Sequence, residues 1–152
     1  MSRRETTDLL TRYYAAFNAQ DWQGMLDCLA DDVAHHVNEG QVRRGKAAFA
    51  EFLAHMDRCY SERLDGIVVM ADEDGARGAA EFTVHGTYRQ TDPGLPEAHG
   101  QNYVLPAGTF VTIEGGLIAR ITTYYNLADW TLQVSGQVSG QVSGQVSGQA
   151  SG

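Results

Sequence analysis

Two adjacent histidines, His35 and His36, are the side chains in this sequence best suited to acid–base chemistry. An unperturbed histidine has a pKa of about 6.5, so it can give or take a proton near neutral pH without a large shift. Residues 33–38 favour a short strand, and successive side chains of a strand point to opposite faces. His36 therefore shares one face with Asn38, whereas His35 shares the other face with Val37. Which of the two histidines meets the interior stays open.

Neither the cysteines nor the acidic residues form a recognisable metal site in the sequence. Cys28 and Cys59 make no CxxC pair, and we interpret both as reduced thiols packed on helices. The acidic run at 72–74 falls in a turn with no histidine near it in sequence, which is typical of a solvated charge cluster. The sequence therefore predicts no metal and no cofactor.

The overall charge limits the classes of partner. The 152 residues include 19 acidic and 11 basic side chains, a net charge of −8. Such a negative field repels phosphate backbones and anionic lipid surfaces, so we expect no nucleic acid and no membrane as a partner. Arg3 and Arg4 are not followed by the apolar stretch of a signal peptide, and no run approaches the ~18 apolar residues of a membrane span. We therefore expect a cytoplasmic protein.

Three helices are predicted in the N-terminal part of the chain. Ser2 and Glu5 have the spacing of a capping box, and apolar residues then recur at three- and four-residue intervals. Asp21 is placed to cap a short second helix, which the acidic pair at 31–32 closes. After the strand that carries the histidines, a third amphipathic helix is predicted to begin at Lys46.

Beyond residue 62 the pattern changes to short strands separated by turn residues. Strands rich in β-branched and aromatic residues are predicted at 67–71, 79–89, 102–113 and 117–125. Pro106 and Gly108 predict a bulge or bend in the third of these strands, because proline cannot donate to a ladder of hydrogen bonds. Helices followed by a run of antiparallel strands indicate an α+β domain, with the helices covering one face of the sheet.

The end of the chain forms a separate segment. From Gln133 the sequence repeats QVSG four times and ends in QASG, without a charged or aromatic residue. Such a segment cannot bury enough apolar surface to offset its ordering entropy. We therefore predict a folded domain over residues 1–132 and a low-complexity tail, residues 133–152, without a function of its own. Self-association through its valines is the alternative.

Several stretches of the sequence resemble one family. The resemblance is carried by RYYAAFNAQDWQGMLDCLADD, the helix after RRGKAAFAEF, the strand AAEFTVHGTY and the closing IEGGLIARITTYYNLADW. These stretches are similar to ketosteroid isomerase, the SnoaL-type polyketide cyclases and nuclear transport factor two, over most of residues 5–132. The resemblance implies a cone-shaped fold, with three N-terminal helices on the concave face of a curved, mainly antiparallel sheet. It also implies a homodimer.

The resemblance points to one site residue and to two departures from the family's chemistry. It puts the tyrosine that the isomerases use on their first helix at Tyr13. The family's two carboxylates fall on Val37 or Asn38 and on Gly108 or Thr109, none of which can take a proton. An isomerase or cyclase mechanism based on those two carboxylates is therefore not expected.

His36, Val37 and Asn38 are similar in spacing to the Tyr-x-Asn set with which limonene epoxide hydrolase, another member of the family, positions a water. We therefore predict His36 as the catalytic acid or base. Asn38 and Tyr13 are predicted as hydrogen-bond donors to a ligand oxygen. The alternative is that His35 and His36 are solvated or hydrogen-bonded strand residues without a catalytic role.

The resemblance also assigns alternate strand residues to the pocket. The expected inward residues are Phe82, Val84, Gly86 and Tyr88 on one strand and Val104, Pro106, Gly108 and Phe110 on the next. The predicted substrate-binding residues are Tyr14, Phe82, Tyr88, Tyr103, Phe110, Tyr125 and Asn126. This mostly apolar set suits a small, largely apolar molecule held by a few hydrogen bonds. We expect a cofactor-independent isomerase, cyclase or hydrolase; the alternative is a non-catalytic small-molecule-binding or dimerisation module.

Overall fold

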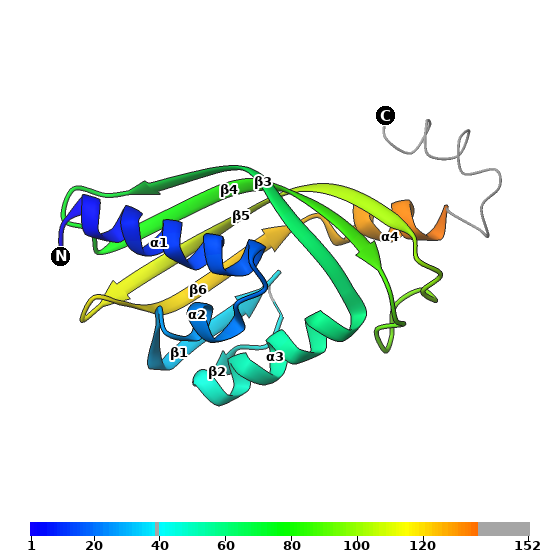
Figure 1. Cartoon of the computed structure of the whole chain (residues 1–152), viewed down its shortest axis with the longest axis horizontal. Helices are drawn as coiled ribbons and strands as arrows, with labels where there is room; N and C mark the ends of the chain where they lie inside the picture. The colour runs from blue at the N-terminus through cyan, green and yellow to red at the C-terminus, as the bar shows by residue number, and fades with distance from the viewer. Residues whose placement is uncertain (39, 137–152) are drawn as a thin grey trace.

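The computed structural model describes residues 1–38 and 40–136, which form an α+β fold as predicted (Figure 1). The elements in chain order are α1 (Arg3–Asn18), α2 (Trp22–Leu26), β1 (Leu29–Val37), β2 (Arg43–Arg44), α3 (Lys46–Cys59), β3 (Tyr60–Ala71), β4 (Arg77–Tyr88), β5 (Asn102–Glu114), β6 (Leu117–Tyr125) and α4 (Leu127–Ser135). The strands form one sheet in the order β2-β1-β6-β5-β4-β3. β1 and β6 run parallel, and the other neighbouring pairs are antiparallel.

The first helix begins where the sequence predicts it, because Ser2 and Glu5 form the expected capping box. The Ser2 hydroxyl accepts a hydrogen bond from the Glu5 backbone N–H at 3.1 Å, and the Glu5 carboxylate accepts one from the Ser2 N–H at 2.9 Å. Leu10 and Tyr13 lie on the face of α1 that packs on β3 and β4, and both are buried. Burying a large apolar side chain stabilises a fold by about 1.5–3 kcal/mol, so this face fixes α1 on the sheet.

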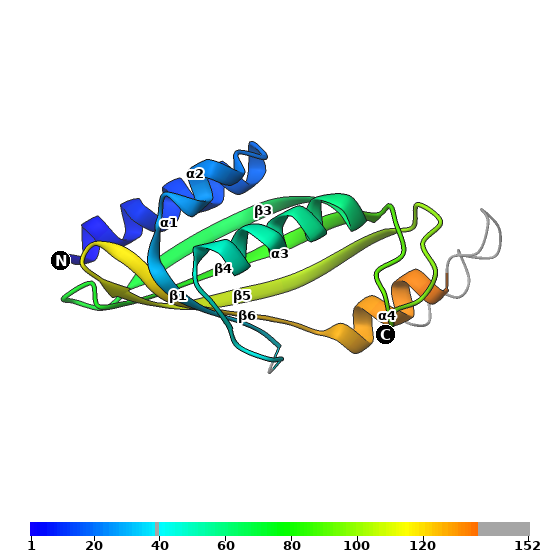
Figure 2. The same ribbon diagram turned by 90° about the horizontal axis from the view of Figure 1, so that it is seen from below.

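The three N-terminal helices lie on the same side of the sheet (Figure 2). Asp21 caps α2, since its carboxylate accepts a hydrogen bond from the Gly24 N–H at 2.9 Å. Lys46 is the first residue of α3, as predicted, and Cys59 is the last, so the chain passes from α3 directly into β3. Within the described ranges, no helix is both long and apolar enough to cross a membrane.

A fourth helix, α4, follows the last strand and was not predicted. Asn126 caps it by accepting a hydrogen bond from the Asp129 N–H at 3.0 Å. Trp130 on α4 is buried, and the centroid of its ring lies 5.0 Å from that of Tyr88 and 6.0 Å from that of Tyr103. The helix therefore closes one end of the space between the sheet and the N-terminal helices.

Two strands begin four or more residues earlier than predicted. β1 starts at Leu29, so the acidic pair at 31–32 lies within the strand instead of closing α2. This is possible because both acidic side chains are exposed while Leu29 and Val33 are fully buried. β3 starts at Tyr60 instead of residue 67, and its first residues already alternate, with Tyr60 and Leu64 buried.

The predicted alternation is confirmed on β4 and reversed on β5. Phe82, Val84 and Tyr88 on β4 are buried, as expected, but Val104 and Phe110 on β5 are 50% and 51% exposed. The reason lies in the register between the strands, because residues paired across neighbouring strands share a face. Inward residues of β4 are opposite the odd-numbered positions of β5, which are the buried ones: Tyr103, Leu105, Thr109 and Val111.

The bulge expected at Pro106 is absent from the ladder between β4 and β5. Pro106 pairs with Thr83 without a change of register. The ladder between β5 and β6 begins only at Ala107, so at Pro106 β5 has a neighbour on one side alone. A proline is tolerated in such a position. The shift in register on β5 lies instead between Thr112 and Ile113.

The last helix extends into the segment predicted as tail. α4 runs to Ser135, and Val134 is 1% exposed. Residues 133–135 therefore form part of the packed fold. Residues 137–152, which make up most of the predicted tail, lie outside the described residues.

Candidate active site

A cavity of about 410 Å³ lies between the N-terminal helices and the face of the sheet that they cover. Most of the side chains around it are apolar or aromatic, including Tyr13, Tyr14, Phe49, Phe52, Phe82, Val84, Leu105, Ile121 and Trp130. The carboxyl groups of Glu62 and Asp92 and the imidazoles of His35 and His55 belong to residues of the same lining. A largely apolar cavity with a few polar groups is the usual form of a small-molecule site.

Glu62 supplies one of the carboxyl groups. It lies on β3 in alternation with the buried residues Tyr60 and Leu64, so its side chain points to the covered face of the sheet. The phenol of Tyr103 donates a hydrogen bond to Glu62 Oε2 at 2.5 Å. Burial raises the pKa of the Glu62 carboxyl above its usual range, and the hydrogen bond from Tyr103 opposes that rise.

Tyr103 remains the donor in this pair. Burial raises the pKa of its phenol, and the nearby charge of Glu62 raises it further. The phenol therefore keeps its proton at neutral pH and donates a hydrogen bond to the carboxylate. Tyr103 does not itself line the cavity, so its hydroxyl holds Glu62 from the side of the sheet.

Gly86 makes the contact between Glu62 and Tyr103 possible. On the sheet, Glu62 pairs with Gly86 across β3 and β4, and Gly86 pairs with Tyr103 across β4 and β5. The three residues therefore share one face, with the glycine in the middle. A Cβ atom at Gly86 would overlap the ring of Tyr103, because that ring lies across the glycine to reach the carboxylate. Any larger residue at this position would displace the phenol.

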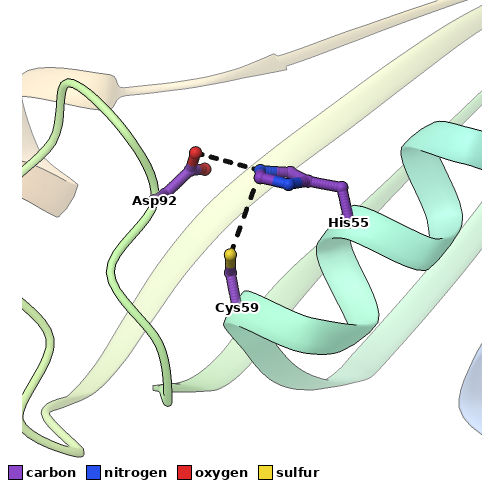
Figure 3. Close-up of side chains that lie close together, drawn as sticks. All are labelled: His55, Cys59 and Asp92. Atoms are coloured by element: carbon purple, nitrogen blue, oxygen red, sulfur yellow. Dashed lines mark hydrogen bonds and ion pairs between the residues drawn. The ribbon is translucent and has the colours of Figure 1, made fainter.

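A second polar group comes from the end of α3 and the loop after β4 (Figure 3). His55 Nε2 lies 2.9 Å from Asp92 Oδ1 and 3.9 Å from the Sγ of Cys59. The other oxygen of Asp92 accepts a hydrogen bond from the phenol of Tyr60 at 2.6 Å. The loop is held in place because the Asp92 N–H donates to the hydroxyl of Tyr88 at 2.9 Å. His55, Asp92 and Tyr60 all line the cavity.

The histidine of β1 that meets the cavity is His35, and its surroundings keep it neutral. Its ring lies between those of Phe49 and Phe52, at centroid distances of 4.5 and 4.6 Å. Burial, together with the smaller effects of the charges of Arg43 and His36, lowers the pKa of His35 to about 4. His35 Nδ1 is buried without a hydrogen-bond partner in the described structure. A group so hard to protonate is a poor base at neutral pH.

The three residues predicted as catalytic are separated by the fold. Tyr13 lines the cavity, but His36 and Asn38 do not. Asn38 has a positive φ of 47° and ends β1: its N–H donates to the carbonyl of Thr123, and its side-chain oxygen accepts from the Tyr125 N–H at 2.9 Å. The side-chain amide of Asn38 is therefore bonded to the backbone of β6.

The residues predicted to bind a substrate divide into two groups. Tyr14, Phe82 and Tyr125 line the cavity, and the hydroxyl of Tyr14 is hydrogen-bonded to that of Thr109. The others among the predicted seven lie outside the lining: Tyr88, Tyr103, Phe110 and Asn126.

Each of these four has a different position. Tyr88 is fully buried and donates a hydrogen bond to the Pro96 carbonyl at 2.6 Å, Tyr103 is bonded to Glu62, and Asn126 caps α4. Phe110 lies on the opposite face of the sheet, against Tyr124, because the alternation on β5 is reversed.

Glu62, His55 and Asp92 were not among the predicted site residues. Glu62 could have been found by beginning β3 at the end of α3, because alternation with Tyr60 and Leu64 then directs it inward. His55 and Cys59 are four residues apart on one helix, which puts them on the same face. Asp92 lies in a loop far along the chain, so no local pattern associates it with that face.

Comparisons with known proteins give the family. Residues 10–121 match the model of the SnoaL-like domain. A putative polyketide cyclase from Pseudomonas putida KT2440 is 57% identical, with 85% of this chain and 97% of that chain covered and a TM-score of 0.84. A putative polyketide cyclase from Silicibacter sp. TM1040 is 56% identical, with coverages of 88% and 98% and a TM-score of 0.85.

A more distant structure agrees in fold alone. An NTF2-like protein from Burkholderia xenovorans LB400 is 18% identical, with 89% of this chain and 96% of that chain covered and a TM-score of 0.68. The comparison with curated proteins found no match. The match spans most of the N-terminal helices and of the strands that enclose the cavity, and the chain belongs to the SnoaL-like domain family.

Proposed function

We propose that this protein is an acid–base enzyme of the polyketide-cyclase type, in which Glu62 moves a proton on a small, largely apolar carbonyl compound. The observation that carries the proposal is a carboxyl group with a raised pKa in the lining of a mostly apolar cavity. A carboxyl group with a raised pKa is a stronger base than an ordinary carboxylate and is suited to accept and return a proton. The names of the two relatives at 57% and 56% identity support the choice of reaction class.

The proposed reaction is an intramolecular aldol addition. The Glu62 carboxylate takes a proton from the carbon next to a carbonyl group, and that carbon then forms a bond to a second carbonyl carbon of the same molecule. The proton returns from Glu62 to the oxygen of the attacked carbonyl, so the carboxylate is restored and no other reactant is consumed. A base of this kind typically contributes a factor of about 10²–10⁴ to the rate.

Phenols in the cavity supply hydrogen bonds to the oxygen on which charge develops. Tyr125 lines the same cavity as both carboxyl groups, and burial, with the charges of Glu62 and Asp92, raises the pKa of its phenol. Tyr13 lines the cavity from α1, and burial raises the pKa of its phenol as well. Both therefore stay protonated and can donate to an enolate oxygen.

The test is the first step of the reaction, which does not need the natural substrate. We expect the full-length protein to accelerate the exchange of the α-protons of a small aryl ketone in D₂O, followed by NMR. Glu62→Gln keeps an oxygen that accepts from Tyr103 but cannot take a proton. We expect it to reduce the exchange rate by a factor of about 100 or more.

The matched control is Glu81→Gln, which makes the same change on an exposed residue of β4. This variant should exchange the ketone protons at the rate of the unchanged protein. Equal rates for the unchanged protein and Glu62→Gln would contradict the proposal, and so would an equal loss in both variants.

A further inference from the structure

His55, Cys59 and Asp92 bring three metal-binding side chains to one point. Their ligand atoms, an imidazole nitrogen, a thiol sulfur and a carboxylate oxygen, all lie within 4.8 Å of one another. His55 and Cys59 are four residues apart on the last turns of α3, so they project from the same face of the helix. Asp92 approaches them from the loop after β4 (Figure 3).

We propose that these three side chains form a binding site for a divalent transition-metal ion of the zinc class. Nitrogen, sulfur and carboxylate ligands in one site are characteristic of zinc and of the cobalt ion that replaces it. A thiolate and a carboxylate together carry two negative charges, which match a divalent cation when the imidazole is neutral. Three protein ligands leave a fourth tetrahedral position for a small ligand.

The distances already approach those of a tetrahedral site. Ligand bonds of about 2.0–2.3 Å separate neighbouring ligand atoms by roughly 3.3–3.7 Å in a tetrahedron. The observed separations from His55 Nε2 are 2.9 Å to the Asp92 oxygen and 3.9 Å to the Cys59 sulfur. The third separation, between the Asp92 oxygen and the Cys59 sulfur, is within 4.8 Å. Shifts of a few tenths of an ångström in the first two separations, and of up to about 1 Å in the third, would therefore create a tetrahedral site.

The surroundings hold the carboxylate in position and leave an approach for the ion. Asp92 Oδ2 accepts the hydrogen bond from Tyr60, which leaves Oδ1 directed at His55. Such bonds to the second oxygen are the usual way in which a ligand carboxylate is oriented. Cys59 is buried, but His55 and Asp92 line the cavity, so an ion would reach the site through it. Neither Glu62 nor Tyr103 is a ligand, so the metal site and the proposed catalytic carboxyl use different side chains.

Cobalt(II) binding to the full-length protein provides the test, after treatment with a chelator and under reducing conditions. We expect one equivalent of Co²⁺ to produce a thiolate-to-cobalt charge-transfer band in the near ultraviolet and visible bands of a four-coordinate ion. Zn²⁺ should displace the cobalt and remove both signals. A folded, reduced protein that gives no charge-transfer band would overturn the proposal.

Variants then identify the ligands. Cys59→Ser should abolish the charge-transfer band, while Cys28→Ser, the same change at the other buried cysteine, should leave it intact. Asp92→Asn should weaken Co²⁺ binding by at least tenfold. Circular dichroism confirms that each variant is folded, and zinc should raise the unfolding temperature of the unchanged protein but not that of Cys59→Ser. A band that survives in Cys59→Ser and disappears in Cys28→Ser would assign the thiolate to the wrong cysteine and refute the site.

Discussion

The hydrogen bond from Tyr103 to Glu62 can be tested by removing one oxygen atom. Tyr103→Phe keeps the ring that packs on Trp130 but deletes the hydroxyl that donates to Glu62 Oε2 at 2.5 Å. That bond stabilises the ionised carboxylate and so lowers its pKa, while burial raises it. Without the bond, burial acts alone, and the pKa of Glu62 must rise further.

The size of the rise follows from the strength of the bond. A hydrogen bond to a charged group contributes about 1.5–3 kcal/mol, and each pKa unit corresponds to about 1.36 kcal/mol. We therefore expect the pKa of Glu62 to increase by about 1–2 in Tyr103→Phe. NMR titration of protein labelled with ¹³C at the glutamate carboxyl measures this directly. The pH at which the ketone-exchange activity rises should move upward by the same amount.

Stability provides a second measurement with a definite sign. A carboxyl whose pKa is higher in the folded than in the unfolded state contributes stability at low pH, which is lost as the pH rises through the folded value. The deleted bond matters most once Glu62 is ionised. The free energy of unfolding of Tyr103→Phe should therefore fall below that of the unchanged protein by more at alkaline pH than at about pH 5.

Tyr124→Phe is the matched control, because it removes a phenol from the opposite face of the sheet. It should leave the titration of Glu62 unchanged. A Glu62 pKa that stays constant or decreases in Tyr103→Phe would refute the reasoning, since it would mean that the phenol does not stabilise the carboxylate.

Three further predictions test the packing around the cavity. Gly86→Ala should destabilise the protein by about 1–3 kcal/mol in thermal unfolding, because the new methyl group overlaps the ring of Tyr103. The control is Gly108→Ala, whose Cβ would come no closer than 3.4 Å to a neighbour and which should destabilise the protein clearly less. His35→Phe should flatten the pH dependence of stability between about pH 6.5 and pH 4. A histidine whose folded-state pKa is lowered to about 4 contributes stability above its unfolded pKa, and this stability is lost as the pH falls through that window. The loss in the unchanged protein is up to about 3 kcal/mol. Urea unfolding at both ends of the window measures it, and an equally steep dependence in the variant would contradict the assignment. Tyr14→Phe and Thr109→Val should each destabilise by about 1–2 kcal/mol, and the double variant by less than their sum, because both break the same buried bond.

The three N-terminal helices and the positions of most strands along the chain could be predicted because their signals are local. The capping box of Ser2 and Glu5, the cap at Asp21 and the apolar spacing of α3 depend on residues within a few positions of one another. The facing of β5 could not be predicted in the same way, because both of its faces carry apolar residues. The pairing of β5 with β4, in which Tyr103 is opposite Gly86, decides which of the two sets of β5 residues is buried. That pairing joins residues far apart in the sequence.

The site was predicted less well than the fold for a related reason. Tyr13, Tyr14 and Phe82 lie on elements that the sequence indicates clearly, and all three line the cavity. The histidine and asparagine chosen on β1 share a face with each other, but the cavity lies on the face of His35. The alternation of side chains along a strand shows which residues share a face, but it does not show which of the two faces is buried. The packing of α3, through Phe49 and Phe52, decides between them.

Glu62 offers a physical reason why this chain can lack acids at the positions where its family resemblance would put them. The positions 37–38 and 108–109 lie at the end of β1 and on β5, whereas Glu62 enters the cavity from β3, an edge strand of the sheet. A carboxyl that arrives from there must cross toward the middle of the sheet and needs a donor to hold it. Tyr103 provides that donor only because Gly86 leaves the space between them open. The three residues thus act as one unit, and a change at Gly86 should alter the pKa of Glu62 in the same direction as the loss of the phenol itself.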